Sequence, residues 1–334
     1  MAAPCSLSAA RWALLAAVAA LAAAVPFATP VELVDRLTFA AIYGIAGLGV
    51  GLLLGQCGIL NLAQAVFYGI GAYASAYGCV ELGWPPVAGI LAGMAVSGAL
   101  AGLIGWPTLR LNGYFLALAT LALCIAGGEL FFEWDWLTGG SYGIGGIPAL
   151  DLGIVRFDRP ETFYYLAWGV LALALVMARN LIASRDGLAA QAMRDAPDAA
   201  AVLAIDMHAL KVKMFVLSAM LGALAGSLFA HHVSFVSVQS FGVERSILFL
   251  LVPVLGGARS LSGIVIGALF VALVPEALSA FGEIHHVLFG LALVAVVILC
   301  PEGLAGLLTR LRGARRPAGA SAPVTSAKEV EHVA

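Results

Sequence analysis

The acidic residues that interrupt long apolar runs are the first candidates for chemistry in this sequence. Glu276 lies within one such run, and Glu129 lies near the end of another. Carboxylates at membrane depth commonly mark a pathway for ions or protons, because a charge there is costly without a partner. A proton-driven device should contain more such groups, and Glu276 equally fits a helix-end residue beside Pro275. The two acids therefore indicate pathway positions but do not by themselves predict a proton relay.

The remaining reactive side chains do not form a catalytic or metal-binding pattern. The pairs His231–His232 and His285–His286 could each offer one metal ligand, because adjacent residues on a helix point in different directions. Interfacial histidines with a pH-sensitive charge fit these pairs better. The five cysteines are dispersed and odd in number, as expected of packing residues. No G-x-x-x-x-G-K-S/T motif occurs, so the sequence predicts no P-loop, no enzyme, and no cofactor or metal.

Membrane-spanning helices are the elements that must position these residues. Of the 334 residues, 62% are hydrophobic and only 11% are charged, far from the composition of a soluble domain. The net charge of -2 gives no indication of nucleic-acid binding. A crossing helix needs about 20 mostly apolar residues, and the candidate runs are 12–30, 38–55, 58–80, 86–107, 112–132, 161–180, 213–231, 244–256, 261–280 and 285–300. The fold class predicted is an all-α polytopic transmembrane helix bundle of about 8–10 spans.

Two of these runs have alternative interpretations. The run 244–256 is short and contains Pro253, so it could be a broken or re-entrant helix that surrounding protein shields from lipid. The first run, 12–30, ends in small residues that would also suit a cleaved signal peptide. A polytopic chain needs no cleaved signal, so a retained first span is the preferred interpretation.

The positive charges assign an orientation to the spans. With both termini in the cytoplasm, the external loops hold four of the seventeen Lys and Arg residues, namely Arg36, Arg156, Arg159 and Arg245. The remaining thirteen face the cytoplasm, in agreement with the positive-inside rule. This orientation places 133–160 in an external loop and 181–212 in a cytoplasmic loop.

The cytoplasmic loop 181–212 is the only long polar stretch between apolar runs. Its centre, 197–205, is rich in Ala and carries Ile205 as an apolar contact residue. Asp195 can cap a helix in which Pro197 lies close to the first position, where the missing N–H costs nothing. Such a helix would fit a groove on a soluble partner. The alternative is a solvated loop whose charges only set the topology.

Glycines at a spacing of four residues predict close helix packing. In lipid, small residues at this spacing let two backbones touch. The pairs are Gly47 and Gly51, Gly98 and Gly102, and Gly222 and Gly226. A weak internal similarity, between SGALAGLIG at 97–105 and LGALAGSLF at 221–229, would be compatible with inverted repeats, although chance competes because Gly, Ala and Leu dominate the composition.

Four segments in the same order resemble the permease subunits of ATP-driven branched-chain amino-acid importers of the LivM type. They are GQCGILNLAQAVFYGIGAY (55–73), RLNGYFLALATLALCIAGGE (110–129), LTGGSYGIGGIP (137–148) and MRDAPDAAAVLAIDMHALKVKMFVLSAMLGALAGSL (193–228). The last segment is similar to the cytoplasmic coupling loop of that family and the span after it. Pro197 and Ala204 depart from the family's Glu and Gly, and Asn61 and Ala63 replace small Ser and Gly positions.

The resemblance implies partners: two ATP-binding subunits, a second homologous permease, an external substrate-binding protein and the surrounding lipid bilayer. The residues implied at the ATPase contact are Arg194, Asp195, Ala199, Ala200, Ile205 and Lys211. The residues predicted for the pathway or its gating are Gln64, Glu129, Gly139, Gly140 and Glu276. Glu129 falls on a Glu of the family pattern. The segment 139–146 is expected to be a flexible external loop facing the binding protein.

The function expected is that of a permease subunit that forms a translocation pathway in a bacterial cytoplasmic membrane. The transmembrane domain covers 1–312, and 313–334 is predicted to be a disordered cytoplasmic tail because it has too little apolar content to fold alone. Branched-chain amino acids are the substrates implied, with urea, amides and organic acids as alternatives. A secondary transporter driven by an ion gradient is the alternative function, and its activity would depend on Glu129 or Glu276.

Overall fold

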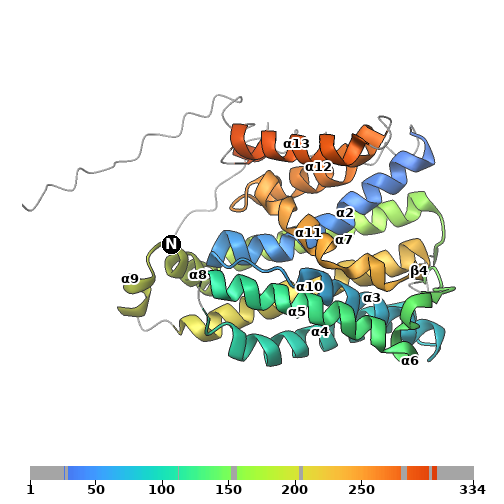
Figure 1. The fold of residues 1–334 in the computed structure, drawn as a ribbon, viewed down its shortest axis with the longest axis horizontal. Helices are drawn as coiled ribbons and strands as arrows, with labels where there is room; N and C mark the ends of the chain where they lie inside the picture. The colour runs from blue at the N-terminus through green and yellow to red at the C-terminus, as the bar shows by residue number, and fades with distance from the viewer. Residues whose placement is uncertain are drawn as a thin grey trace, which may run out of the picture.

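The chain forms a bundle of long helices that lie side by side in alternating directions (Figure 1). The computed structural model describes residues 26, 29–111, 113–151, 156–202, 206–279, 284–300 and 303–306. Its longer helices are α2 (Val31–Leu52), α3 (Gln64–Val80), α4 (Pro86–Thr108), α5 (Tyr114–Glu133), α7 (Pro160–Ile182), α10 (Met207–Val233), α11 (Val243–Gly256), α12 (Leu261–Ser279) and α13 (His285–Leu299). The shorter ones are α6 (Asp135–Thr138), α8 (Arg185–Asp195) and α9 (Pro197–Val202).

The predicted all-α polytopic fold is confirmed. Within the described residues, seven helices are long and apolar enough to cross a membrane. The run predicted at 244–256 is one of them, because the 3₁₀ turn Val238–Phe241 lengthens α11 into an apolar segment of 19 residues. Most of the run 12–30 and all of the tail 313–334 lie outside the described residues.

Two predicted spans begin at the wrong residue. The span expected at 38–55 begins at Val31, because Pro30 opens α2 and Glu32 lies in its first turn, where an acid complements the helix dipole. The span expected at 58–80 becomes helical only at Gln64. A π-helical turn, Leu53–Cys57, ends α2, and the left-handed Gly58 stops it.

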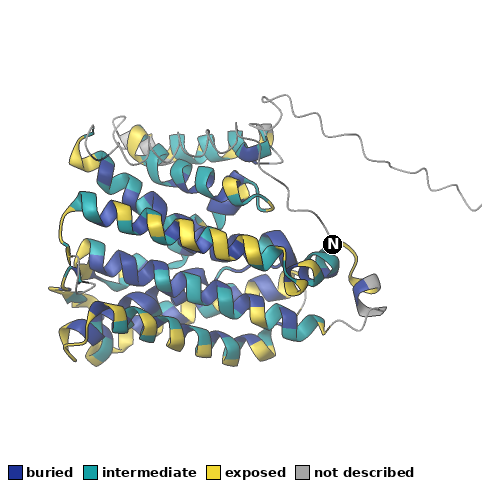
Figure 2. Ribbon diagram, turned by 180° about the vertical axis from the view of Figure 1, so that it is seen from behind, coloured by how far each residue is buried: buried dark blue, intermediate teal, exposed yellow. Residues whose placement is uncertain are grey.

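The helices α2 and α10 form the centre of the bundle. The spans that contain them are 78% and 61% buried over their most apolar windows, whereas the other five spans are at most 33% buried. Figure 2 shows the consequence, with exposed positions along the outer helices. Gly226 of α10 explains the close approach to α3, because an added Cβ would overlap the backbone carbonyl of Tyr68.

The glycine pairs behave as predicted at most positions. Added Cβ atoms at Gly47 and Gly51 would lie 2.5 Å from Val252 and 2.9 Å from Ile264, and one at Gly222 would lie 2.8 Å from the side chain of Gln64. Gly102 is the exception, since its nearest neighbour would be 3.7 Å away. The two segments 97–105 and 221–229 lie on α4 and α10, which pack against each other, and their relation as inverted repeats stays a prediction.

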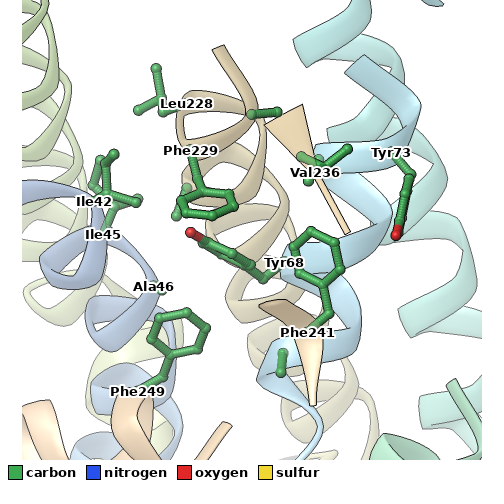
Figure 3. Close-up of a cluster of buried hydrophobic side chains, with 14 of the residues drawn as sticks. Ile42, Ile45, Ala46, Tyr68, Tyr73, Leu228, Phe229, Val236, Phe241 and Phe249 are labelled. Atoms are coloured by element: carbon green, nitrogen blue, oxygen red, sulfur yellow. The ribbon is translucent and has the colours of Figure 1, made fainter. Parts of the chain in front are cut away.

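An aromatic cluster fills the interior between α2, α3, α10 and α11 (Figure 3). The ring of Tyr68 is fully buried, and its centroid lies 4.9 Å from that of Phe249 and 5.5 Å from that of Phe229. Phe241, from the turn before α11, covers Tyr68 on another side at 5.8 Å. The cluster ties these helices together inside the bundle.

Candidate functional site

The break between α2 and α3 is the centre of the candidate site. Residues 58–63 are not helical, although they lie between two apolar helices. Backbone N–H and C=O groups in such a segment must find partners inside the protein, because lipid supplies none. Non-helical backbone is therefore expected at this position only where side chains of neighbouring helices form hydrogen bonds with its N–H and C=O groups.

Gln64, the first residue of α3, links the end of this segment to the neighbouring helices. Its side chain is fully buried, and its Nε2 donates to the carbonyl oxygens of Ala46 at 3.3 Å and Ser218 at 3.0 Å. Its Oε1 accepts from Asn61 Nδ2 at 3.2 Å and from the Ser218 hydroxyl at 3.1 Å. One amide thus joins α2, the broken segment and α10. The predicted pathway residue Gln64 lies at a buried junction and not on an open surface.

Two hydroxyl groups complete the network around the break. Thr120 of α5 accepts from the Leu62 amide at 3.1 Å. Ser246 of α11 donates to the Leu62 carbonyl at 2.6 Å and accepts from the Ala65 amide at 3.4 Å. Side chains of α3, α5 and α11 therefore bond to the broken segment, and α10 is linked to it through Gln64. A displacement of any of these helices would disturb the segment.

The helix α8 reaches the break through Arg194. The guanidinium Nη1 of Arg194 donates to the carbonyl oxygen of Gly55, in the π-helical turn. Ser184 begins α8 as an N-cap, accepting from the Gly187 amide at 3.3 Å. Ala190 and Met193 are buried against the bundle, so α8 is held to the membrane domain on one side.

Asp195 connects the same helix to the turn between α11 and α12. Its Oδ1 accepts from Arg259 Nη2 at 2.6 Å, with both side chains more than half exposed. The turn also touches the π-helical segment directly, since a Cβ at Gly55 would overlap the carbonyl of Ala258. The ends of α2, α8 and the α11–α12 turn thus meet at the end of the bundle that carries α8 and α9. Arg194, Lys211, Lys213 and Arg259 lie there, which the positive-inside rule assigns to the cytoplasm.

The predicted coupling residues differ in their burial and in the elements that carry them. Ala200 is buried, and Lys211 lies on the first turns of α10 and not in a loop. Ile205 lies outside the described residues, and for Ala199 only the backbone is described, within α9. The helix expected around 197–205 is present as α9, with Pro197 first as predicted.

The capping role predicted for Asp195 is wrong. Asp195 is the last residue of α8, and Ala196 separates it from α9. Its carboxylate accepts a hydrogen bond from Arg259, and Ala196 contributes the backbone carbonyl that accepts from the Ala200 amide.

At the opposite end, Gly139 and Gly140 form a folded cap and not the flexible loop expected. Both have positive φ angles, of 72° and 53°, and an added Cβ would overlap Gly143 O or Asp135 Oδ1. Thr138 fixes the turn by donating to the Phe131 carbonyl at 2.6 Å and accepting from the Gly140 amide. The strand β1 (Ile144–Gly145) then pairs with β4 (Phe235–Val236), so the cap joins the end of α5 to the end of α10.

The first predicted histidine pair lies at this same end of the bundle. His231 is buried, with Nδ1 2.8 Å from the Pro148 carbonyl and Nε2 2.8 Å from the Ser75 hydroxyl. Since a carbonyl only accepts, Nδ1 carries the proton and Nε2 accepts from Ser75. His232 lies 3.5 Å from Asp35. In the described part of the chain no three metal-binding side chains gather.

The two predicted acids face away from the interior. Glu276 accepts from Arg36 at 2.8 Å, and both side chains are substantially exposed, at 45% and 39%. Glu129 lies on the exposed face of α5. The bundle therefore does not bring these acids together with Gln64.

Sequence reasoning missed Gly55, Arg259, Thr120, Ser218 and Ser246. The three hydroxyl residues were detectable as polar residues within apolar runs. Gly55 and Arg259 carried no local signal, because their partners are 139 and 64 residues away along the chain.

Replacing Gln64 with Met should destabilise the folded protein by about 2 kcal/mol, because buried partners lose their hydrogen bonds while side-chain length is kept. The measurement is the thermal unfolding temperature of the purified protein in mild detergent. Thr108→Val is the matched control, since the Thr108 hydroxyl donates only within its own helix, to Ile104 and Gly105. Equal unfolding temperatures for the two variants would contradict the junction role of Gln64.

The matching family model and the similar known proteins are all permeases of branched-chain amino acid transport systems. The family model described as "Branched-chain amino acid transport system / permease component" matches residues 32–297. The chain is 32% identical to the high-affinity branched-chain amino acid transport system permease protein LivM of Escherichia coli K12, over 87% of this chain and 74% of that protein. It is 25% identical to the permease protein LivH of the same organism, over 82% of this chain and 94% of LivH. No solved structure matches the chain.

Proposed function

This chain belongs to the family of branched-chain amino acid transport system permease components, and from that premise we propose how it works. It is one permease subunit of an ATP-driven importer in a bacterial cytoplasmic membrane. A second, homologous permease completes the translocation pathway. Two ATP-binding subunits dock on the cytoplasmic end, and an external substrate-binding protein delivers branched-chain amino acids to the opposite end.

The observation that carries this proposal is the attachment of α8 to the break between α2 and α3. A cytoplasmic loop that only set the topology would not need buried contacts with the spans. Here Ala190 and Met193 are buried against the spans, Arg194 donates to the Gly55 carbonyl, and Asp195 pairs with Arg259 at the surface. A force applied to α8 and α9 from the cytoplasm would therefore reach the broken segment and the α11–α12 turn together.

The two faces of α8 and α9 have different roles in coupling. Leu188, Pro197 and Asp198 are exposed and form the surface for the ATP-binding subunit. Arg194 and Asp195 face the bundle and transmit the movement. Closing of the ATPases would shift α8, and the packed helices would move as rigid bodies to alternate access.

A substitution of Glu276 distinguishes the proposed ATP-driven mechanism from transport driven by an ion gradient. As an exposed partner of Arg36, its carboxylate contributes an ion pair of less than about 1 kcal/mol. Glu276→Gln should therefore leave leucine uptake in cells within about twofold of the wild type. Loss of uptake with normal amounts of the protein in the membrane would favour the ion-driven mechanism instead.

The proposal is tested by identifying the partners. The protein is extracted from its own membranes in mild detergent, and the co-purifying chains are identified by mass spectrometry. We expect an ATPase with a P-loop and a second permease of the same family. A Leu188→Asp variant, which places a charge on the exposed face of α8, should lose the ATPase and keep the second permease. Recovery of this chain alone would contradict the proposal.

A further inference from the structure

The outward face of α5 differs from the other exposed faces of the bundle. Phe115, Leu118, Ile125 and Phe132 are between 42% and 69% exposed, and their spacing puts them along one side of the helix. Glu129 is exposed on the same side, four residues after Ile125. The stripe is therefore apolar apart from Glu129 and from Glu133, which is the last residue of α5 and lies next to Trp134.

Glu129 lies too deep to reach the aqueous phase as a helix-end residue would. Trp134 and Trp136 are exposed just beyond α5, with ring centroids 5.6 Å apart, and exposed tryptophans typically mark the membrane surface. Glu129 precedes Trp134 by five positions, which places Glu129 about 7.5 Å further into the bundle than Trp134. A carboxyl group facing hydrocarbon there needs a hydrogen-bonding partner whether it is charged or neutral.

Lipid alone can cover the exposed faces of other helices, such as α4 and α13. On α4 the most exposed large side chains are Leu91, Leu103 and Trp106, and on α13 they are Val287 and Ile298, all of them apolar or interfacial. Nothing on these faces requires a protein neighbour. A carboxyl group within the exposed face, one turn inside the end of the helix, sets α5 apart from α4 and α13.

Resting on the proposed function, we propose that the outer half of α5 is the surface that binds the second permease subunit. We call the residues Ile125, Gly128, Glu129 and Phe132 the α5 patch. The ATP-binding subunits dock beyond α8 at the opposite end of the bundle, and a soluble external protein does not enter hydrocarbon. Of the partners of such an importer, only another membrane-embedded chain reaches this depth. That chain supplies a donor to Glu129.

Gly128 gives the patch a shape that suits a helix. A Cβ added to Gly128 would have no atom of this chain within 4 Å, so packing inside the chain does not require a glycine. Glycine within a helix costs about 1 kcal/mol relative to Ala. With Ile125, Glu129 and Phe132 around it, Gly128 forms a notch that lets a partner helix approach closely.

The steric test fills this notch. Gly128→Leu should fold normally and lose most of the co-purified second permease, because the new side chain occupies the partner's place. Gly169→Leu on α7 is the matched control, since Gly169 is also helical with open space around it but has no carboxyl group on its stripe. Size-exclusion profiles in detergent establish that both variants fold. Retention of the second permease by both variants, or its loss from both, overturns the proposal.

A second measurement locates the contact directly. A photo-crosslinking amino acid replaces Ile125 in one variant and Leu173, exposed on α7, in another. We expect the variant with the crosslinker at position 125 to crosslink to the second permease. The variant with the crosslinker at position 173 should crosslink to lipid alone. Crosslinking of position 125 only to lipid, or to a second copy of this chain, overturns the proposal. If the wild-type protein recovers no second permease at all, the proposed function itself fails, which distinguishes the two results.

Discussion

Replacing Arg194 with Ala is expected to lower ATP-dependent uptake by about tenfold or more while the protein remains folded in the membrane. The guanidinium donates to the Gly55 carbonyl at the end of α2, and hydrogen bonds to charged groups contribute about 1.5–3 kcal/mol. Without this bond, α8 keeps its N-cap and its buried residues but loses its link to the break. The measurement is the initial rate of labelled leucine uptake, normalised to the amount of permease in the membrane.

Arg185→Ala is the control for this prediction. Arg185 is the first residue of α8 and is exposed, so its loss removes the same charge and leaves the link to Gly55 intact. Equal uptake rates in the two variants would show that Arg194 acts only through its charge.

Gly226→Ala is expected to destabilise the protein by more than about 3 kcal/mol, so that little folded protein is recovered. The added methyl group would overlap the carbonyl oxygen of Tyr68, which belongs to the backbone of α3 and cannot rotate away. Separating α3 from α10 would also disturb the aromatic cluster around Tyr68 and the hydrogen bonds of Gln64. The measurement is the yield of monodisperse protein in detergent together with its unfolding temperature.

Gly102→Ala provides the comparison for Gly226→Ala. Both glycines lie within helices, but a Cβ added at Gly102 would meet its nearest neighbour, Val216, only at 3.7 Å. Because Ala favours the helix more than Gly does, this variant should be as stable as the wild type or slightly more so. A normal yield of the Gly226 variant would mean that α3 and α10 do not approach as closely as described.

The fold and the position of the coupling segment could be predicted from local sequence signals. Apolar runs of sufficient length predict spans, and a polar stretch bounded by basic residues predicts a cytoplasmic loop, so the position of α8 and α9 followed from composition and charge. Pro197 marked the start of α9 for a local reason, since proline is favoured in the first helical position.

The contacts of the site could not be predicted in the same way. Gln64 meets Ser218 across 154 residues, and Arg36 meets Glu276 across 240, so each pairing depends on which helices pack together. The break at 58–63 was hidden for a related reason. Its residues are apolar enough to continue a span. Only Gly58 in the left-handed conformation and the partners from α5 and α11 show that the helix stops.

The glycine-rich segment 139–146 shows a third limit of prediction from sequence. Five glycines between 139 and 146 indicated flexibility, yet Gly139, Gly140, Gly143 and Gly146 have the positive φ angles that a tight folded cap requires. Glycine permits both outcomes, and the tertiary contacts of Thr138 and β4 decide between them. The predicted gating role of Gly139 and Gly140 stays a prediction.

The central claim is that movement of α8, caused by ATP hydrolysis on the cytoplasmic side, opens a pathway through the spans. The most direct test is labelled leucine uptake into proteoliposomes that contain the natively extracted complex, with the external binding protein supplied outside. We predict uptake that requires enclosed ATP and persists when ionophores collapse the proton and sodium gradients. Uptake without ATP that disappears when those gradients collapse would contradict the account.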